Sequence, residues 1–330
     1  MKLAYFSCHA ILEYDELKIF EELGIDYFSF GSYVRPQEPI DPIRPALGHV
    51  VSQEMLDKAP PRDALTKEFM DQFDVIVIMH VTDWIVQNWE LFKGKRVIWR
   101  TIGQSTKKHE LQMLPFKNQG MQIVRYSPFE RNLQSYCGED AVIRFYKDPD
   151  EFKDWNGNSQ DVITISQDMK NRGEFVNYDT FMKVAEGIPS MMLYGTKNEH
   201  TPLSGGFLNY EEMKERLKSA RAYFYTHSQP ACYTLNFMEA LMTGVPVVAI
   251  GKRFAESLNI APDTYEVPSI IKNGENGFCA DSIEELQEYI RQLTASHSFA
   301  KRISRSGRQL ALEYFGKDIV KKQWKEFLGV

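Results

Sequence analysis

The residues best suited to bind a charged ligand lie in one stretch, Ala222–Gly251, which is predicted to form a strand, a polar loop, a helix and a second strand. The loop, His227–Tyr233, precedes Thr234, a residue type that caps helices. Backbone N–H groups and the positive dipole end at a helix start suit phosphate. Glu239 is the only acid in a polar position of this helix, and it is either a ligand-binding carboxylate or a solvated surface residue.

A second set of polar residues follows two apolar strands in the first half of the chain. His80 comes directly after the strand Asp74–Met79, and Thr101–Ser105 surrounds Gly103 after the strand Arg96–Arg100. Loops at the carboxyl ends of parallel strands line the ligand-binding crevice of an open α/β sheet. A single histidine in such a place is either a functional group or a structural side chain, and both hypotheses stay open for His80.

The composition is that of a globular protein, with 43% hydrophobic, 13% aromatic and 25% charged residues among 330. This length is sufficient for two domains of ordinary size, each with its own core. The formal net charge of −6 argues against a surface built broadly to bind nucleic acid, because the positive electrostatic footprint of such proteins is missing.

Cysteine spacing and hydropathy predict the compartment. Four widely separated cysteines, Cys8, Cys137, Cys232 and Cys279, lack metal-ligand spacing and indicate free thiols in a reducing compartment. The first residues hold one lysine and an apolar stretch interrupted at His9, which does not fit a signal peptide. No run approaches the roughly 18 apolar residues of a membrane span. We expect a cytoplasmic protein, with peripheral contact to a membrane left open.

Alternating strand and helix patterns position these polar loops. They predict one doubly wound α/β domain at residues 1–147 and a second series of strands and helices at residues 161–315. The polar linker between them, residues 148–160, contains Asp148-Pro149-Asp150, a triplet of the kind that holds metal elsewhere but that fits a structural loop better. A last helix is predicted within residues 316–330.

Three shorter segments complete these local predictions. Phe129–Tyr136 is predicted to be a helix and Ala141–Tyr146 a strand that closes the first sheet. Thr201–Asn209 contains Gly205-Gly206 and is predicted to be a flexible loop, because paired glycines give the backbone unusual freedom.

The stretch around Glu239 resembles the donor-site motif of GT-B glycosyltransferases, particularly the large retaining group that uses nucleotide-sugars (family 4-like, group 1). Glu239-Ala240-Leu241-Met242-Thr243-Gly244-Val245-Pro246-Val247-Val248 matches the family pattern Glu-Ala-x-x-x-Gly-x-Pro-Val-Val. Asn273-Gly274-Glu275-Asn276-Gly277 matches a recurrent turn of the C-terminal domain. The likeness implies an α/β GT-B fold, in which two Rossmann-like doubly wound domains face a cleft and the last helix crosses back to the N-terminal domain.

The resemblance also implies a donor, a nucleotide-diphosphate sugar such as a UDP-sugar or GDP-sugar, bound without a metal or cofactor. Family members hold the diphosphate with an arginine and a lysine; Gln167 stands at the arginine position and Arg172 at the lysine position. Arg172 keeps a charge and a planar fork suited to phosphate. Glu239 is expected to accept hydrogen bonds from the ribose. The implied donor-binding set is Ser166, Gln167, Arg172, Gly195, Thr196, Lys197, Tyr233, Thr234, Leu235 and Glu239.

The chain departs from the family pattern at the first motif glutamate, where it has Ala231. A retaining transferase, the favoured hypothesis, could use backbone groups around Ala231. An inverting transferase could take its base from His80 or His9. Family members place a donor-contacting histidine after the corresponding N-terminal strand, so the resemblance assigns His80 to the sugar or acceptor. A nucleotide-sugar-binding protein without transferase activity and a sugar-nucleotide epimerase remain as alternatives.

The sequence does not indicate the acceptor, which could be a glycan, a lipid, a small molecule or a macromolecule. The candidate acceptor-side residues are His9, Arg100 and Gln104. The stretch Tyr33–Arg62 is too rich in proline for regular structure, and it is either an acceptor-side loop or a surface linker.

Overall fold

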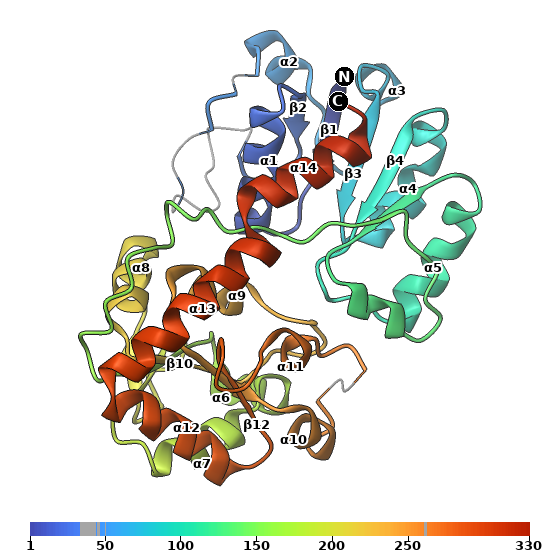
Figure 1. Ribbon diagram of the computed structural model, residues 1–330. Coiled ribbons are helices and arrows are strands. Elements are labelled where there is room, and N and C mark those ends of the chain that lie inside the picture. Colours follow the sequence, from blue (N-terminus) through green and yellow to red (C-terminus); the bar gives the residue numbers. More distant parts are fainter. Residues whose placement is uncertain (34–43, 45–46, 50, 261–262) are drawn as a thin grey trace. The chain divides into compact units, whose positions relative to one another are not determined.

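The computed structural model describes residues 1–33, 44, 47–49, 51–260 and 263–330, which divide into two compact units (Figure 1). The first unit comprises Met1–Phe145 and Val320–Val330, and the second comprises Tyr146–Ile319. Each unit contains a six-stranded sheet whose neighbouring strands are all parallel. Two parallel sheets with flanking helices are the two-domain, Rossmann-like α/β architecture expected from the sequence, and this prediction is confirmed.

The first unit is built on short strands that are largely buried, as the continuous apolar sequence Val-Ile-Val-Ile-Met of one of them requires. These strands are β1 (Lys2–Phe6), β2 (Asp26–Ser29), β3 (Val75–Met79), β4 (Arg96–Arg100), β5 (Gln122–Arg125) and β6 (Ala141–Val142). Their order in the sheet is β2-β1-β3-β4-β5-β6. The helices of this unit are α1 (Ala10–Glu22), α2 (Gln53–Lys58), α3 (Lys67–Met70), α4 (Thr82–Phe92) and α5 (Lys107–Lys117).

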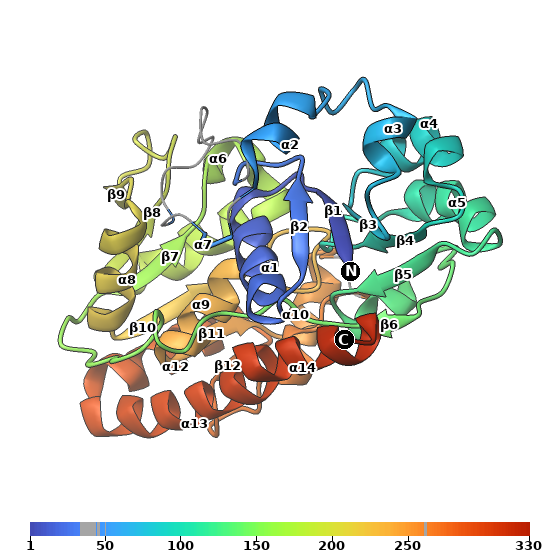
Figure 2. The same ribbon diagram turned by 90° about the horizontal axis from the view of Figure 1, so that it is seen from above.

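The second unit repeats this plan with the order β12-β11-β10-β7-β8-β9 (Figure 2). Its strands are β7 (Val162–Ile165), β8 (Met191–Tyr194), β9 (Ser204–Gly206), β10 (Ala222–Tyr225), β11 (Val247–Ile250) and β12 (Phe278–Ala280). Its helices are α6 (Met169–Arg172), α7 (Tyr178–Glu186), α8 (Tyr210–Ser219), α9 (Leu235–Thr243), α10 (Lys252–Ser257), α11 (Val267–Ile270), α12 (Ile283–Ala295) and α13 (His297–Phe315), with a 3-10 turn at Gly173–Val176.

The last helix, α14 (Lys317–Leu328), begins in the second unit and ends in the first. The Trp324 ring is completely buried and lies edge-on to Phe20 of α1, with 5.2 Å between ring centroids. Arg96 of β4 donates hydrogen bonds to the carbonyl groups of Phe327 (2.5 Å) and Leu328 (3.1 Å). The guanidinium therefore satisfies two of the carbonyl groups that a helix end leaves without intrahelical partners.

Two local predictions in the first unit are wrong in extent. The segment after Ser127 forms only a 3-10 turn, Pro128–Asn132, and not a helix to Tyr136, because Ser135 has a left-handed backbone (φ 65°) that a helix excludes. The last strand is only the two residues of β6. The carbonyl of Ile143, just beyond it, accepts a hydrogen bond from the Arg100 side chain (2.6 Å) instead of continuing the ladder.

The predicted flexible loop in the second unit contains a short strand, β9, at the edge of the sheet. Glycine is needed there because a Cβ atom on Gly205 would lie 2.2 Å from the Tyr194 ring. The paired glycines thus allow close approach of the strand to an aromatic side chain, a role that sequence alone does not distinguish from flexibility.

Residues 34–43, 45–46 and 50 of the proline-rich stretch lie outside the described residues, so the acceptor-side hypothesis for this stretch stays a prediction. None of the helices in the described part of the chain combines the length and the apolar composition that a membrane span requires.

Candidate functional site

Polar loops meet at the carboxyl ends of β7 and β8 in the second unit, and a buried asparagine joins them. The side-chain amide of Asn198 donates hydrogen bonds to the carbonyl groups of Ser166 (2.6 Å) and Gly195 (3.0 Å). Its oxygen accepts a hydrogen bond from the backbone N–H of Met169 (2.9 Å). A Cβ atom on Gly195 would lie 2.4 Å from the Ser166 carbonyl, so only glycine permits this approach.

The start of α9 lies beside the same loops. Asn236 donates a hydrogen bond from its side chain to the carbonyl of Ile165, the last residue of β7 (2.6 Å). Thr234 occupies the N-cap position with an extended backbone, but its side chain makes no capping hydrogen bond. The ring of Tyr233 is buried, 5.2 Å from the Phe315 ring, so only its backbone is available to a ligand. Backbone N–H groups that the Thr234 side chain leaves uncapped favour an anion at this helix start.

Arg172 connects the β7 loop to the β10 loop. Its guanidinium donates a hydrogen bond to the Ser228 hydroxyl (2.7 Å) and a longer one to the Gln167 carbonyl (3.4 Å). The side chain of Arg172 is largely exposed, as are those of Gln167 and Lys197. The implied diphosphate-binding residues of these two loops therefore lie on a solvent-accessible surface, with one guanidinium held in place.

The loop between β10 and α9 carries the position of the missing motif glutamate. Ala231 is half-buried, and its N–H donates a hydrogen bond to the Ser228 carbonyl (3.0 Å). His227 of the same loop is buried, with a left-handed backbone (φ 72°) and its ring 4.4 Å from that of Tyr265. Burial lowers the pKa of His227 to about 3, so this imidazole is neutral at physiological pH.

Glu239 is buried inside the second unit, with 3% of its surface exposed. Its Oε1 lies 3.0 Å from the Nζ of Lys147, whose side chain is completely buried. The alternative that Glu239 is a solvated surface residue is therefore wrong. Its assignment to the ribose hydroxyl groups stays a prediction.

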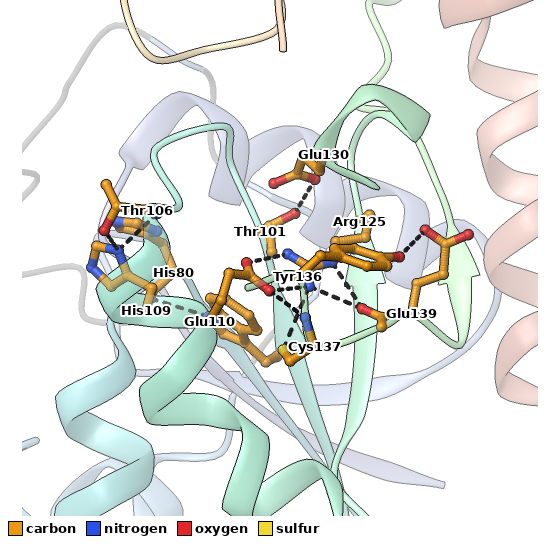
Figure 3. Close-up of polar contacts among 12 residues, drawn as sticks. His80, Thr101, Thr106, His109, Glu110, Arg125, Glu130, Tyr136, Cys137 and Glu139 are labelled. Atoms are coloured by element: carbon orange, nitrogen blue, oxygen red, sulfur yellow. Dashed lines mark hydrogen bonds and ion pairs between the residues drawn. The ribbon is translucent and has the colours of Figure 1, made fainter. Parts of the chain in front are cut away.

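In the first unit, His80 follows β3 with a left-handed backbone (φ 61°), which is uncommon for a residue other than glycine. The Trp99 indole N–H donates to its carbonyl (3.1 Å), and its ring lies 5.0 Å from that of His109 (Figure 3). The Nδ1 atom of His80 is buried without a hydrogen-bond partner among the described residues. Burial lowers the pKa of His80 to about 4, helped by His109, which makes the ring neutral at pH 7.

The loop after β4 lies beside Glu130, a completely buried acid that the sequence analysis missed (Figure 3). Glu130 accepts hydrogen bonds from the Thr101 hydroxyl (2.6 Å) and the Tyr126 N–H (3.1 Å), whereas its Oε1 has no partner among the described residues. Gly103 allows the loop to rest on Tyr126, since a Cβ atom there would lie 2.3 Å from the Tyr126 hydroxyl oxygen. Glu130 thus holds the loop after β4 through Thr101, while its Oε1 has no hydrogen-bond partner among the described residues.

Glu130 is expected to make stability depend on pH. Burial raises its pKa from 4.5 to about 7, although the charge of Arg125 opposes the shift. Between these values the folded state binds more protons than the unfolded state, so this carboxyl group lowers stability as pH rises. A shift of this size corresponds to about 3 kcal/mol.

The measurement is the unfolding free energy of wild type and Glu130→Gln between pH 4 and pH 8. From pH 4 to pH 8, the unfolding free energy of the variant is expected to rise by about 3 kcal/mol relative to that of wild type. A difference that does not change with pH would show that Glu130 does not titrate with a raised pKa.

The three candidate acceptor-side residues have different environments. Gln104 is exposed, and His9 is the half-buried N-cap of α1, where its Nδ1 accepts a hydrogen bond from Leu12 (3.5 Å). Arg100 is completely buried: it pairs with Glu16 (2.8 Å), and its guanidinium lies 4.0 Å from the centre of the Phe145 ring. The structure therefore gives Arg100 a role in packing and no access to an acceptor.

The Asp148-Pro149-Asp150 triplet is structural. Asp148 pairs with Lys317 (3.0 Å) and accepts a hydrogen bond from the backbone N–H of Asp150 (2.9 Å). Within the described residues, no group of three or more His, Cys, Asp or Glu side chains has the arrangement of a metal site.

The structure thus brings together Ser166, Gln167, Gly195, Thr196 and the start of α9 in the second unit. In the first unit, the His80 ring contacts the His109 ring. The His109 ring in turn lies 3.0 Å from the hydroxyl of Thr106, which directly follows the loop Thr101–Ser105. Asn198, Lys147 and Glu130 were not predicted from the sequence. Asn198 could have been predicted, because a short amide side chain after a strand end often hydrogen-bonds to the backbone. Nothing in the sequence around Lys147 or Glu130 indicates their roles.

No protein-family model matches the chain, and no curated protein matches it significantly in sequence. Several solved structures resemble this chain over nearly the whole length of both proteins. Sucrose-phosphate synthase from Thermosynechococcus elongatus has a TM-score of 0.71 at 12% identity, covering 100% of this chain and 98% of that one. HepE from Anabaena in complex with UDP-glucose has a TM-score of 0.70 at 13% identity, covering 100% and 99%.

A glycosyltransferase from Rickettsia africae has a TM-score of 0.68 at 13% identity, covering 99% of this chain and 98% of that one. The chain has the GT-B fold. The fold expected from the motif around Glu239 is therefore confirmed. In this GT-B chain, the motif begins in α9 and ends in β11, as the strand–helix–strand pattern predicted.

Proposed function

We propose that this GT-B chain is a glycosyltransferase that moves a sugar from a UDP-sugar to an acceptor, with retention of configuration as the favoured outcome. The observation that carries the proposal is its likeness, over the whole chain, to HepE in complex with UDP-glucose. The polar loops after β7, β8 and β10 support it, because they combine a fixed guanidinium with a helix start suited to phosphate. A UDP-sugar is preferred to a GDP-sugar because the HepE complexes hold UDP or UDP-glucose.

The proposed chemistry requires the protein to stabilise the leaving diphosphate as its negative charge grows. Arg172 and the backbone N–H groups at the start of α9 would do so electrostatically. Glu239 would bind the ribose, and neutral His80 would hydrogen-bond to the sugar or acceptor. With Ala231 in place of the first motif glutamate, the groups near the anomeric carbon would be those of the backbone.

The test is a screen of purified protein against UDP-sugars, with GDP-sugars as comparison, that follows both donor hydrolysis and the melting temperature. Stabilisation by one UDP-sugar together with release of UDP would support the proposal. A protein that neither binds nor cleaves any nucleotide-sugar would contradict it.

A non-catalytic nucleotide-sugar-binding protein is the second candidate, and Ala231 is the observation that favours it. A methyl group can neither orient a donor sugar nor carry charge. Binding of a UDP-sugar without turnover, in the presence of glycan, lipid and small-molecule acceptors, would favour this candidate over the transferase.

Arg172→Ala is expected to weaken UDP binding by tenfold or more and to leave uridine binding unchanged. A charge-assisted hydrogen bond to phosphate is worth about 1.5–3 kcal/mol. Uridine has no phosphate and makes no such bond, so the substitution cannot weaken its binding in this way. Calorimetry with uridine, UMP and UDP measures the difference. Lys170→Ala is the matched control, since this exposed lysine lies on the same short helix, α6. Equal losses for all three ligands would assign Arg172 a structural role.

A further inference from the structure

The buried contact between Lys147 and Glu239 links the donor motif to the first residues of the second unit. Lys147 is the second residue of this unit, and its N–H donates a hydrogen bond to the Phe315 carbonyl (3.0 Å). Its backbone also forms a parallel bridge with Gly316. The Lys147 side chain is completely buried, and its ammonium ends 3.0 Å from Glu239 and 5.7 Å from the centre of the Phe152 ring. The ammonium thus extends from an anchored backbone.

Without Lys147, the Glu239 carboxylate would be a buried charge without a counter-ion. Burying a charge without a partner is costly, so the ammonium offsets the cost of burying this carboxylate. The contact with Lys147 Nζ also holds Oε1 in place, which is a condition for accepting hydrogen bonds from a cis-diol.

We propose that Lys147 is a positioning residue for the nucleoside end of the donor, acting through Glu239 on the ribose 2′- and 3′-hydroxyl groups. This inference rests on the proposed function, in which Glu239 binds the ribose of a UDP-sugar. Lys147 does not touch the ligand itself. Its effect is therefore confined to ligands that carry both ribose hydroxyl groups.

The experiment compares the affinities of UDP and 2′,3′-dideoxy-UDP by calorimetry for wild type, Lys147→Met, Lys147→Arg and Glu239→Gln. Wild type is expected to prefer UDP. Lys147→Met should weaken UDP binding by about tenfold and change dideoxy-UDP binding less than about twofold. Lys147→Arg keeps the charge, and it should restore at least part of the preference. A purely structural contact would instead weaken both ligands alike, which would overturn the inference.

A double variant keeps the test decisive if Lys147→Met does not fold. Lys147→Met/Glu239→Gln removes both charges of this pair, so neither of the two is left buried without the other. It should show the same UDP preference as Glu239→Gln alone, because the proposed effect of Lys147 on the ribose passes through Glu239. A further loss confined to UDP in the double variant would mean that Lys147 contacts the ligand directly, and the inference would be wrong.

The outcomes also separate this inference from the proposed function. Wild-type protein that binds no UDP or UDP-sugar would overturn both. UDP-sugar turnover with an unchanged ligand preference in Glu239→Gln would leave the transferase intact and overturn the role of Lys147.

Discussion

Glu110→Gln is expected to destabilise the chain by about 3–5 kcal/mol, because it leaves a buried guanidinium without its counter-ion. The two carboxylate oxygens of Glu110 each lie 2.7 Å from a guanidinium nitrogen of Arg125, and both side chains are completely buried (Figure 3). One of these oxygens also accepts a hydrogen bond from the Cys137 N–H (2.9 Å). The pair joins α5, the helix that also carries His109, to β5.

The pKa of Glu110 shows which effect dominates. Burial by itself would raise it, but the hydrogen bonds and charge of Arg125 outweigh burial and lower it. A lowered pKa means that the stabilisation is present above the ordinary pKa of a glutamate and is lost as pH falls through the folded-state value. The cost of Glu110→Gln should accordingly shrink in acid.

Urea unfolding of wild type and Glu110→Gln at pH 7 and pH 4 measures both effects. Glu90→Gln is the matched control, because Glu90 forms an ion pair with Lys93 (2.6 Å) on the exposed side of α4. Exposed pairs contribute about 0–1 kcal/mol. If Glu110→Gln costs no more than the control, the buried pair does not stabilise the unit. A loss of about 3–5 kcal/mol would be a large part of a typical total of 5–15 kcal/mol.

The parts of the fold that follow from local pattern were predictable. Continuous apolar runs such as β3 and β11 identify buried parallel strands, and Gly244 marks the end of α9 because it adopts a left-handed backbone (φ 96°). The loops after these strands then fall at one edge of each sheet. The donor-binding residues of the second unit were assigned by the resemblance to GT-B glycosyltransferases, and Asn198 and Asn236 explain how their loops are held together.

The partners of buried charges could not be predicted, because tertiary packing chooses them. Lys147 and Glu239 are far apart in the sequence, and neither lies in a pattern that points to the other. Arg100 was predicted to be an acceptor-side residue because it ends a strand. In the structure it is buried and forms an ion pair with Glu16 of α1. Hydrophobic periodicity predicts which apolar residues are buried, but it does not predict which charged side chains are buried beside them.

His80→Ala is expected to reduce turnover with a UDP-sugar by about a hundredfold while the affinity for the donor nucleotide changes little. His80 stands at the carboxyl end of β3 with a strained backbone, and its Nδ1 is buried without a partner among the described residues. Strained residues with unpaired polar atoms are concentrated at functional sites. A neutral imidazole that orients a reacting group acts mainly in the transition state, so its removal lowers the rate constant more than the binding.

His109→Ala is the matched control, because this neighbouring ring, carried by α5, contacts the His80 ring (Figure 3). His80→Asn separates backbone from side-chain effects, since asparagine tolerates a left-handed backbone better than alanine. Melting temperature, nucleotide affinity and turnover per folded molecule should be measured on each preparation. If His80 acts on the sugar or acceptor, both His80 variants lose turnover at near-normal affinity, and His109→Ala retains most of it. If instead His80→Ala melts earlier but its folded fraction turns over at the wild-type rate, His80 is a core residue, and the assignment of function to the first unit fails.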